Sequence, residues 1–208
     1  PFDVEKAEQR LVQVVSRITE TDLPLIYANM VGGQDELVFD GGSFALNRAG
    51  KLACQFPYFS EHLSCLTLRR VADDVHLTGP LVQPDGANEA LWRALMLGLR
   101  DYCDKNGFPS VIFGLSGGID SAIVAALAVD ALGSDRVHAV MMPSDYTAEI
   151  SVTDADKLAE ALGIKLDTIA IRKGMAAFDN MLAPSFKGQN PGLAEENIQS
   201  RLRGMLLM

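Results

Sequence analysis

The chain has 208 residues, of which 48% are hydrophobic, and a formal net charge of −9 at pH 7. This length allows one large domain or two small ones, each with a packed core. The acidic balance argues against nucleic acid or an anionic membrane as a partner, because no run of Lys and Arg offsets it. No apolar run reaches the roughly 20 residues of a spanning helix, and the first residues lack the apolar region of a signal peptide.

We therefore expect a cytoplasmic location. The three cysteines support this expectation, since Cys54, Cys65 and Cys103 are odd in number and lack metal-type spacing. We interpret them as reduced thiols. The three histidines are scattered, and none receives a role.

The first half of the chain predicts one helix followed by hairpins. Apolar residues recur at helical spacing through 4–20, in a stripe formed by Val4, Ala7, Leu11, Val14, Val15 and Ile18. The apolar run 25–31 then predicts a buried strand. Glycine-containing turn signals separate three further short runs, which indicates the hairpins of an antiparallel or mixed sheet.

The second half alternates helices and strands. Helices are expected at 89–106, 119–132 and 151–162, and strands at 111–115, 137–142 and 166–171. This order is typical of an α/β fold with a doubly wound parallel sheet, whose ligands bind at the carboxyl ends of the strands. Residues 79–88 are turn-rich and aperiodic, so we predict a linker there between domains 1–78 and 89–208.

A glycine turn joins the strand at 111–115 to the helix at 119–132. Free N–H groups at such a turn, together with the positive end of the helix dipole, form an anion site. Ser116 and Ser121 can donate hydroxyl hydrogen bonds to phosphate oxygens. Asp120 would be repelled by a phosphate, so a divalent cation between the two is expected.

Two local motifs have simpler explanations as well. The glycine pair can be a plain connection, with Ser or Asp capping the helix. The turn lacks the Gly-Lys-Ser/Thr of a Walker A loop and the G-x-G-x-x-G of a dinucleotide site. Met142-Pro143-Ser144 leaves the second strand at its carboxyl end, where its backbone could read an adenine edge or form a simple proline turn.

The turn resembles the S-G-G-x-D-S signature of the PP-loop ATP pyrophosphatases, which split ATP into AMP and pyrophosphate. Three more segments match one family in the expected order: 31–41 (VGGQDELVFDG), 142–147 with Met-Pro-Ser and Tyr-Thr, and 195–204 (EENIQSRLRG). With these segments the chain resembles the glutamine-dependent NAD synthetases. Such enzymes join a nitrilase-like amidase domain, an α/β sandwich, to a PP-loop synthetase domain of the adenine-nucleotide alpha-hydrolase type.

The resemblance implies a reaction and a set of site residues. ATP adenylates the nicotinate carboxylate of deamido-NAD, and ammonia released from glutamine then displaces AMP. ATP and Mg²⁺ are implied, with the metal held by Asp120. The implied ATP-binding residues are Gly114, Leu115, Ser116, Gly117, Gly118, Ile119, Asp120, Ser121, Met142, Pro143 and Ser144.

Other parts of the implied site lie outside the turn. The spacing of Asn197, Arg201 and Gly204 places them on one side of a helix. This side can be a solvated polar face, whereas the resemblance implies that Asn197 and Arg201 contact deamido-NAD. Lys6 matches a family lysine that binds glutamine. Family likeness also implies a homo-oligomer. Where the family has Thr ahead of the two glutamates, this chain has Leu193-Ala194.

The amidase nucleophile of the family is a cysteine upstream of the first residue here, and none of the three cysteines occupies its context. We therefore assign no catalytic residue and expect the middle part of a larger protein, inactive by itself. Two alternatives stay open: another PP-loop adenylating ligase with a different acceptor, and a non-catalytic nucleotide-binding module.

Overall fold

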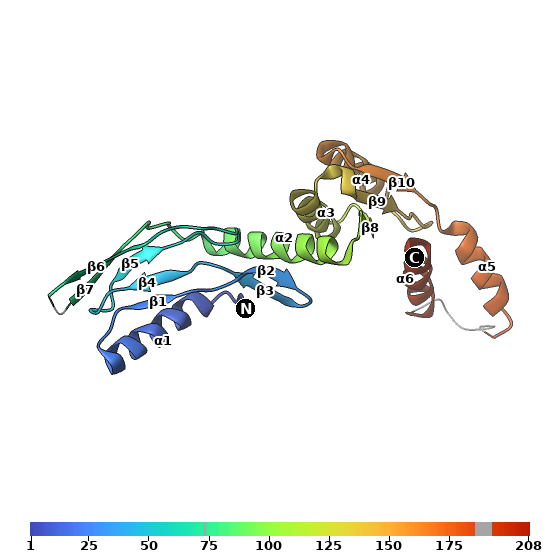
Figure 1. Cartoon of the computed structure of the whole chain (residues 1–208). Coiled ribbons are helices and arrows are strands. Elements are labelled where there is room, and N and C mark those ends of the chain that lie inside the picture. Colours follow the sequence, from blue (N-terminus) through green and yellow to red (C-terminus); the bar gives the residue numbers. More distant parts are fainter. Residues whose placement is uncertain (73, 186–192) are drawn as a thin grey trace. The chain divides into compact units, whose positions relative to one another are not determined.

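The computed structural model describes residues 1–72, 74–185 and 193–208, with side chains of 193–195 not described. The chain divides into two compact units, Pro1–Asn106 and Gly107–Met208 (Figure 1). The described residues include no helix that is long and apolar enough to cross a membrane.

The N-terminal unit is built from one long helix at each end and short antiparallel strands between them. Its elements are α1 (Lys6–Thr21), β1 (Leu25–Tyr27), β2 (Val31–Gln34), β3 (Leu37–Asp40), β4 (Phe44–Leu46), β5 (Leu52–Gln55), β6 (Thr67–Val71), β7 (Asp74–Thr78) and α2 (Ala87–Asn106). The strands form a sheet in the order β1-β4-β5 and the two hairpins β2-β3 and β6-β7. The predicted helix and antiparallel hairpins are confirmed.

The predicted strand at 25–31 is in fact two strands. β1 pairs with β4, and β2 pairs with β3, so the chain changes sheets between Tyr27 and Val31. At Asn29 the backbone N–H donates to the Ser43 hydroxyl at 2.9 Å, and the side-chain amide donates to the Gly41 carbonyl at 2.9 Å. These side-chain bonds replace ladder bonds and end the first strand.

The apolar stripe of α1 also differs from the predicted one. Arg10, Val14 and Ile18 are buried, whereas Val4 is 64% exposed and Val15 41% exposed. Val14 and Ile18 pack with Phe44 and Leu46 of β4. At the other end of the unit, Ala94 and Leu97 of α2 pack around Phe59 with Val31 and Val38 of the β2-β3 hairpin.

The C-terminal unit is an α/β layer around a parallel sheet, as predicted. Its elements are β8 (Val111–Gly114), α3 (Ile119–Leu132), a 3-10 turn (Ser134–Arg136), β9 (Val137–Met141), α4 (Glu149–Leu162), β10 (Lys165–Thr168), α5 (Arg172–Leu182) and α6 (Leu193–Leu207). The sheet order is β10-β9-β8, with both pairs parallel. Two details were not predicted: the third strand is shorter than expected and is followed by α5, and α6 begins at Leu193, two residues before the 195–204 segment.

Helices pack on both faces of the central strand β9. Val140 and Met142 point to one face, where Ile171, Met175, Leu202 and Leu207 cover them. The alternate residues Ala139 and Met141 are buried as well, and α3 and α4 contact the same strand. Burial on both faces explains the continuous apolar sequence of this strand.

Candidate nucleotide-binding site

The glycine turn lies where the sequence places it, between the carboxyl end of β8 and the first turn of α3. Leu115 is 1% exposed, and its N–H donates to the Val140 carbonyl of β9 at 3.0 Å. This bond extends the sheet by one residue and fixes the direction in which the chain enters the turn. The turn therefore opens at the edge of the sheet where α/β folds bind ligands.

Glycine is required at position 117 for two separate reasons. Its φ is +77°, in the left-handed region that side chains rarely adopt. A Cβ atom there would lie 2.1 Å from the carbonyl oxygen of Ser151, at the start of α4. The turn is thus pressed directly against the backbone of the next helix. Gly118 follows in an extended conformation as the N-cap of α3, with no side-chain capping bond.

The two serine hydroxyls hold the turn closed. Their Oγ atoms are 3.0 Å apart, and the Ser121 hydroxyl donates to the Gly118 carbonyl at 2.9 Å. The N–H of Ser116 donates to Ser121 Oγ at 3.2 Å, and the N–H of Gly118 donates to Ser116 Oγ at 3.3 Å. Both hydroxyls therefore lie within the turn, beside the backbone N–H groups that an anion would meet.

Asp120 is exposed in the first turn of α3. Within the described ranges, no group of three or more His, Cys, Asp or Glu side chains could hold a metal ion by itself. Magnesium in nucleotide sites is bound by one or two carboxylates together with substrate phosphates. Asp120, a single carboxylate beside the glycine turn, therefore fits a magnesium ion that is bound together with the phosphates of a nucleotide.

The segment after β9 is folded back on itself. The Ser144 N–H donates to the Thr147 hydroxyl at 2.9 Å, and the Thr147 N–H donates to the Ser144 carbonyl at 3.2 Å. The Pro143 carbonyl accepts from the Ile171 N–H at 3.0 Å. Ser144 is only 6% exposed, so its hydroxyl stabilises the loop from within.

A cavity of about 250 Å³ lies between this segment and the glycine turn. Its lining residues are Gly114, Leu115, Ser116, Val140, Met141, Met142, Thr147 and Arg203. The cavity thus brings together the ends of two neighbouring strands with residues predicted for ATP. Gly117 and Gly118 instead line a second, more open groove with Asp154 and Lys157 of α4.

Four lining residues were not predicted as site residues: Val140, Met141, Thr147 and Arg203, of which Arg203 is the charged one. Its Nε donates to the Met142 carbonyl at 3.1 Å, which joins α6 to the end of β9. The predicted residues Asn197 and Arg201 lie on the same helix but are exposed, and neither lines the cavity. The sequence gives one sign of Arg203, because it is the second arginine of Arg201-Leu202-Arg203. It was not selected, because the i, i+4 spacing pairs Asn197 with Arg201 and not with Arg203.

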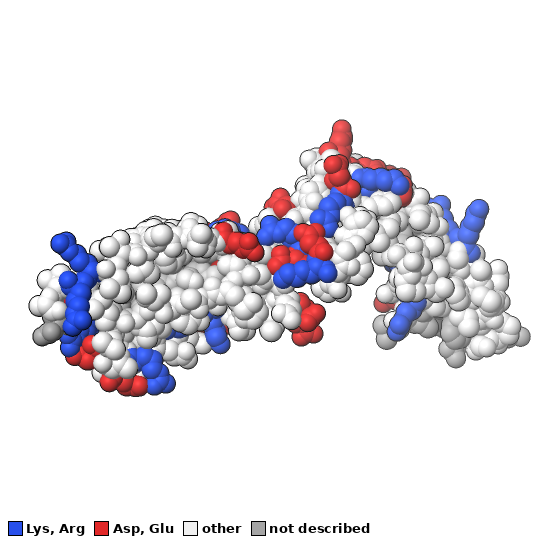
Figure 2. Space-filling model, in the orientation of Figure 1, with Lys and Arg blue, Asp and Glu red and all other residues white. Residues whose placement is uncertain are grey.

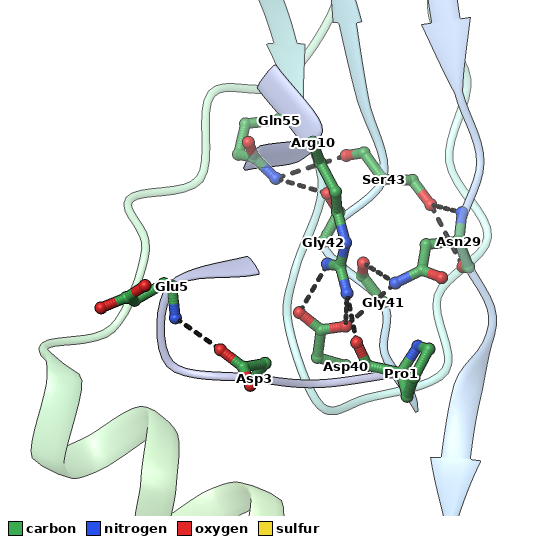
Figure 3. A network of polar contacts seen from close by, with 10 residues as sticks. All are labelled: Pro1, Asp3, Glu5, Arg10, Asn29, Asp40, Gly41, Gly42, Ser43 and Gln55. Atoms are coloured by element: carbon green, nitrogen blue, oxygen red, sulfur yellow. Dashed lines mark hydrogen bonds and ion pairs between the residues drawn. The ribbon is translucent and has the colours of Figure 1, made fainter. Parts of the chain in front are cut away.

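A buried polar network occupies the N-terminal unit (Figure 3). Arg10 donates to both carboxylate oxygens of Asp40 at 2.8 Å, and to the Pro1 carbonyl at 3.1 Å. Asn29 donates to Asp40 at 3.0 Å. The hydrogen bond to Asp40 raises the pKa of Arg10, against the opposing effect of burial. The network holds Arg10, which lies one helical turn after Lys6, the residue predicted to bind glutamine.

Comparison with known proteins identifies the family of this chain. The family model described as NAD synthase matches residues 91–208, which is more than half of the chain. This chain belongs to the NAD synthase family. Its curated relatives include the glutamine-dependent NAD(+) synthetases of Rhodobacter capsulatus, 49% identical over 100% of this chain, and of Synechocystis sp., 49% identical over 90%.

A solved NAD synthetase structure has the same fold. The glutamine-dependent NAD+ synthetase of Acinetobacter baumannii, in complex with ADP, superimposes with a TM-score of 0.93 at 39% identity over 100% of this chain. The chain spans 38% of the Rhodobacter relative, 34% of the Synechocystis relative and 39% of the Acinetobacter chain. The expected family and α/β fold class are therefore confirmed.

Proposed function

We propose that this chain binds ATP at the 114–121 turn and serves the amidation of deamido-NAD to NAD, with ammonia supplied from glutamine. One observation carries the proposal: Gly117, at φ +77°, is pressed against the Ser151 backbone and leads directly into the N-terminus of α3. This geometry presents backbone N–H groups and a helix dipole to an anion. Membership of the NAD synthase family supports ATP as this anion and NAD formation as the reaction.

The reaction proceeds in two displacements. A carboxylate oxygen of nicotinate attacks the α-phosphorus of ATP, and the bond to the bridging oxygen breaks so that pyrophosphate leaves with its electron pair. Ammonia then attacks the carboxyl carbon, and AMP leaves with the former carboxylate oxygen as a proton is lost. Adenylation is needed because a carboxylate oxygen is otherwise a poor leaving group.

The turn residues act by position and charge. The N–H groups of Gly117 and Gly118 and the hydroxyls of Ser116 and Ser121 would hold the departing pyrophosphate. Asp120 would bind Mg²⁺, which neutralises phosphate charge when it is bound. Reorientation of the serine hydroxyls, which now bond within the turn, would accompany phosphate binding.

The remaining substrates are assigned to residues outside the turn. Asn197 and Arg201 of α6 would contact deamido-NAD, and their exposure supports a site shared with a second copy of the chain in a homo-oligomer. Lys6, at the start of α1, would bind glutamine. We propose residues 1–78 as part of the amidase domain, 79–88 as the linker and 89–208 as part of the synthetase domain, although by contacts α2 groups with the N-terminal unit.

The test is exchange of labelled pyrophosphate into ATP, measured in a polypeptide of the relatives' full length that contains this chain, here called the full-length polypeptide. We expect exchange that requires deamido-NAD and is lost in Asp120→Asn. Exchange with a different carboxylate acceptor would identify another PP-loop ligase, and no exchange with any acceptor would identify a binding module. Either result overturns the proposal.

A further inference from the structure

Arg203 enters the cavity from a helix whose position is fixed by packing. Its neighbours Leu202 and Leu207 pack on the apolar face of Val140, Met142 and Ile171. Leu202 also lies so close to Gly174 of α5 that a Cβ atom there would come within 2.5 Å of its Cδ2. The packing of Leu202 and Leu207, which precede and follow Arg203 in α6, therefore holds its guanidinium at the carboxyl end of β9.

One edge of the guanidinium is already used. The Nε–H of Arg203 donates to the Met142 carbonyl at 3.1 Å, which leaves the two terminal nitrogens as donors. Among the residues that the structure describes, no carboxylate forms an ion pair with Arg203, whereas Arg10, Arg48 and Arg93 each have one. A planar guanidinium fixed along one edge is well arranged to bind a phosphate.

The cavity walls indicate which part of a nucleotide lies beside Arg203. Leu115, Val140 and Met142 give apolar surface suited to a base and a sugar. Polar groups come from Ser116, Thr147 and Arg203. Since Gly117 and Gly118 face the separate groove, the cavity suits the adenosine end and the groove suits the outer phosphates. The phosphate attached to adenosine would then lie at Arg203.

Charge supports the same placement. The chain carries a net charge of −9, and acidic and basic side chains are interleaved on the face shown in Figure 2. An anionic nucleotide therefore needs a local cation. Among the cavity's described lining residues, Arg203 is the one cationic side chain.

We propose that Arg203 binds the α-phosphate of ATP and keeps this contact in the adenylate and in AMP. This inference rests on the proposed ATP site and adds a residue to it. When the carboxylate attacks the α-phosphorus, negative charge spreads over the oxygens of that phosphate, where the terminal nitrogens of Arg203 stabilise it. Arg203 is thus a binding residue for both displacements.

The test compares AMP with adenosine, which differ by this phosphate alone. Dissociation constants are measured by calorimetry in the full-length polypeptide and its Arg203→Met variant. We expect AMP binding to weaken on the order of tenfold or more, with adenosine binding unchanged. Arg203→Lys should recover part of the loss, because it restores charge without the planar fork. Lys173→Met, which removes an exposed charge from α5, serves as the matched control.

Adenosine binding also reports whether the cavity is intact. An equal loss of affinity for AMP and adenosine would show that Arg203 supports the cavity walls or stacks on the base, and unchanged affinity for both would show that Arg203 does not bind the phosphate. Either result overturns the inference while the proposed function stands. Absence of ATP and AMP binding in the unsubstituted protein overturns the proposed function and this inference together.

Discussion

Arg10 and Asp40 form a two-bonded ion pair inside the N-terminal unit, with both N–O distances at 2.8 Å and relative exposures of 7% and 3%. The pair joins α1 to the end of β3 across 30 residues of sequence. Burial removes both charges from water at a large cost in free energy. If one partner is removed, the other charge stays buried without compensation and the folded state is destabilised.

We expect Arg10→Met to lower the free energy of unfolding by about 3–5 kcal/mol, because Asp40 keeps its buried charge and loses its cation. Arg17→Met is the matched control. Its partner Glu20 is 2.6 Å away in an exposed pair, which is worth at most about 1 kcal/mol. Denaturant unfolding, followed by the fluorescence of the single tryptophan, Trp92 of α2, measures both. Equal losses in the two variants would contradict the role given to the buried pair.

Gly117→Ala should destabilise the C-terminal unit and abolish ATP binding, because the new Cβ meets the Ser151 backbone. Gly163→Ala separates this clash from backbone strain. Gly163 has φ +66° but nothing within 4 Å of an added Cβ, so its cost is about 1–2 kcal/mol with ATP binding retained. Circular dichroism and ATP calorimetry measure both variants. If the two substitutions have the same effect, the close approach of the turn to α4 is wrong.

The three cysteines should differ in reactivity. Cys65 is exposed, whereas Cys54 and Cys103 are 0% and 2% exposed. Burial also raises the pKa of the Cys54 thiol, which reduces its thiolate fraction. We expect one fast equivalent with a thiol reagent in the native protein and all three after unfolding. Rapid labelling that persists in Cys65→Ser would show that a buried thiol is accessible.

Asp167 should contribute a pH-dependent stability. Its Oδ2 lies 2.9 Å from Lys165 Nζ and 2.8 Å from His138 Nε2, and these bonds, Lys165 first, lower its pKa below 3.8. A lowered folded-state pKa gives stabilisation that is complete above the unfolded value and is lost as the pH falls through the folded value. As the pH falls through the acidic range, Asp167→Asn should therefore lose less stability than the unsubstituted protein.

Lys165→Met should give an intermediate result in the same unfolding experiment, since His138 remains. An NMR titration of the Asp167 carboxyl provides a direct check. A midpoint at or above 3.8 would contradict the cited contacts.

Local sequence patterns predicted the elements that carry the site. Three adjacent signals specify strand, turn and helix in that order. They are the apolar run 111–115, the glycine pair and the helical spacing that begins at Ile119. Each of these signals depends on backbone preferences of the residue itself and its neighbours. For this reason the turn was predicted with its correct place in the fold.

Contacts between distant residues could not be predicted in the same way. Arg203 reaches Met142 across 61 residues, and Arg10 reaches Asp40 across 30. No spacing rule marks such partners, because the fold alone brings them together. Arg10 did leave one signal: it shares a helical stripe with Val14 and Ile18, where a charged residue requires a buried partner. The break at Asn29 likewise depends on Ser43 and Gly41, which lie in the connection between β3 and β4.

In the proposed reaction, the nicotinate carboxylate is activated by transfer of AMP from ATP. Deamido-NAD labelled with ¹⁸O in both oxygens of this carboxylate tests it directly, with ATP, Mg²⁺ and ammonium supplied to the full-length polypeptide. Mass spectrometry should find one ¹⁸O atom in the phosphate of AMP for each NAD formed. Label in pyrophosphate or inorganic phosphate, or AMP without label, would contradict the account.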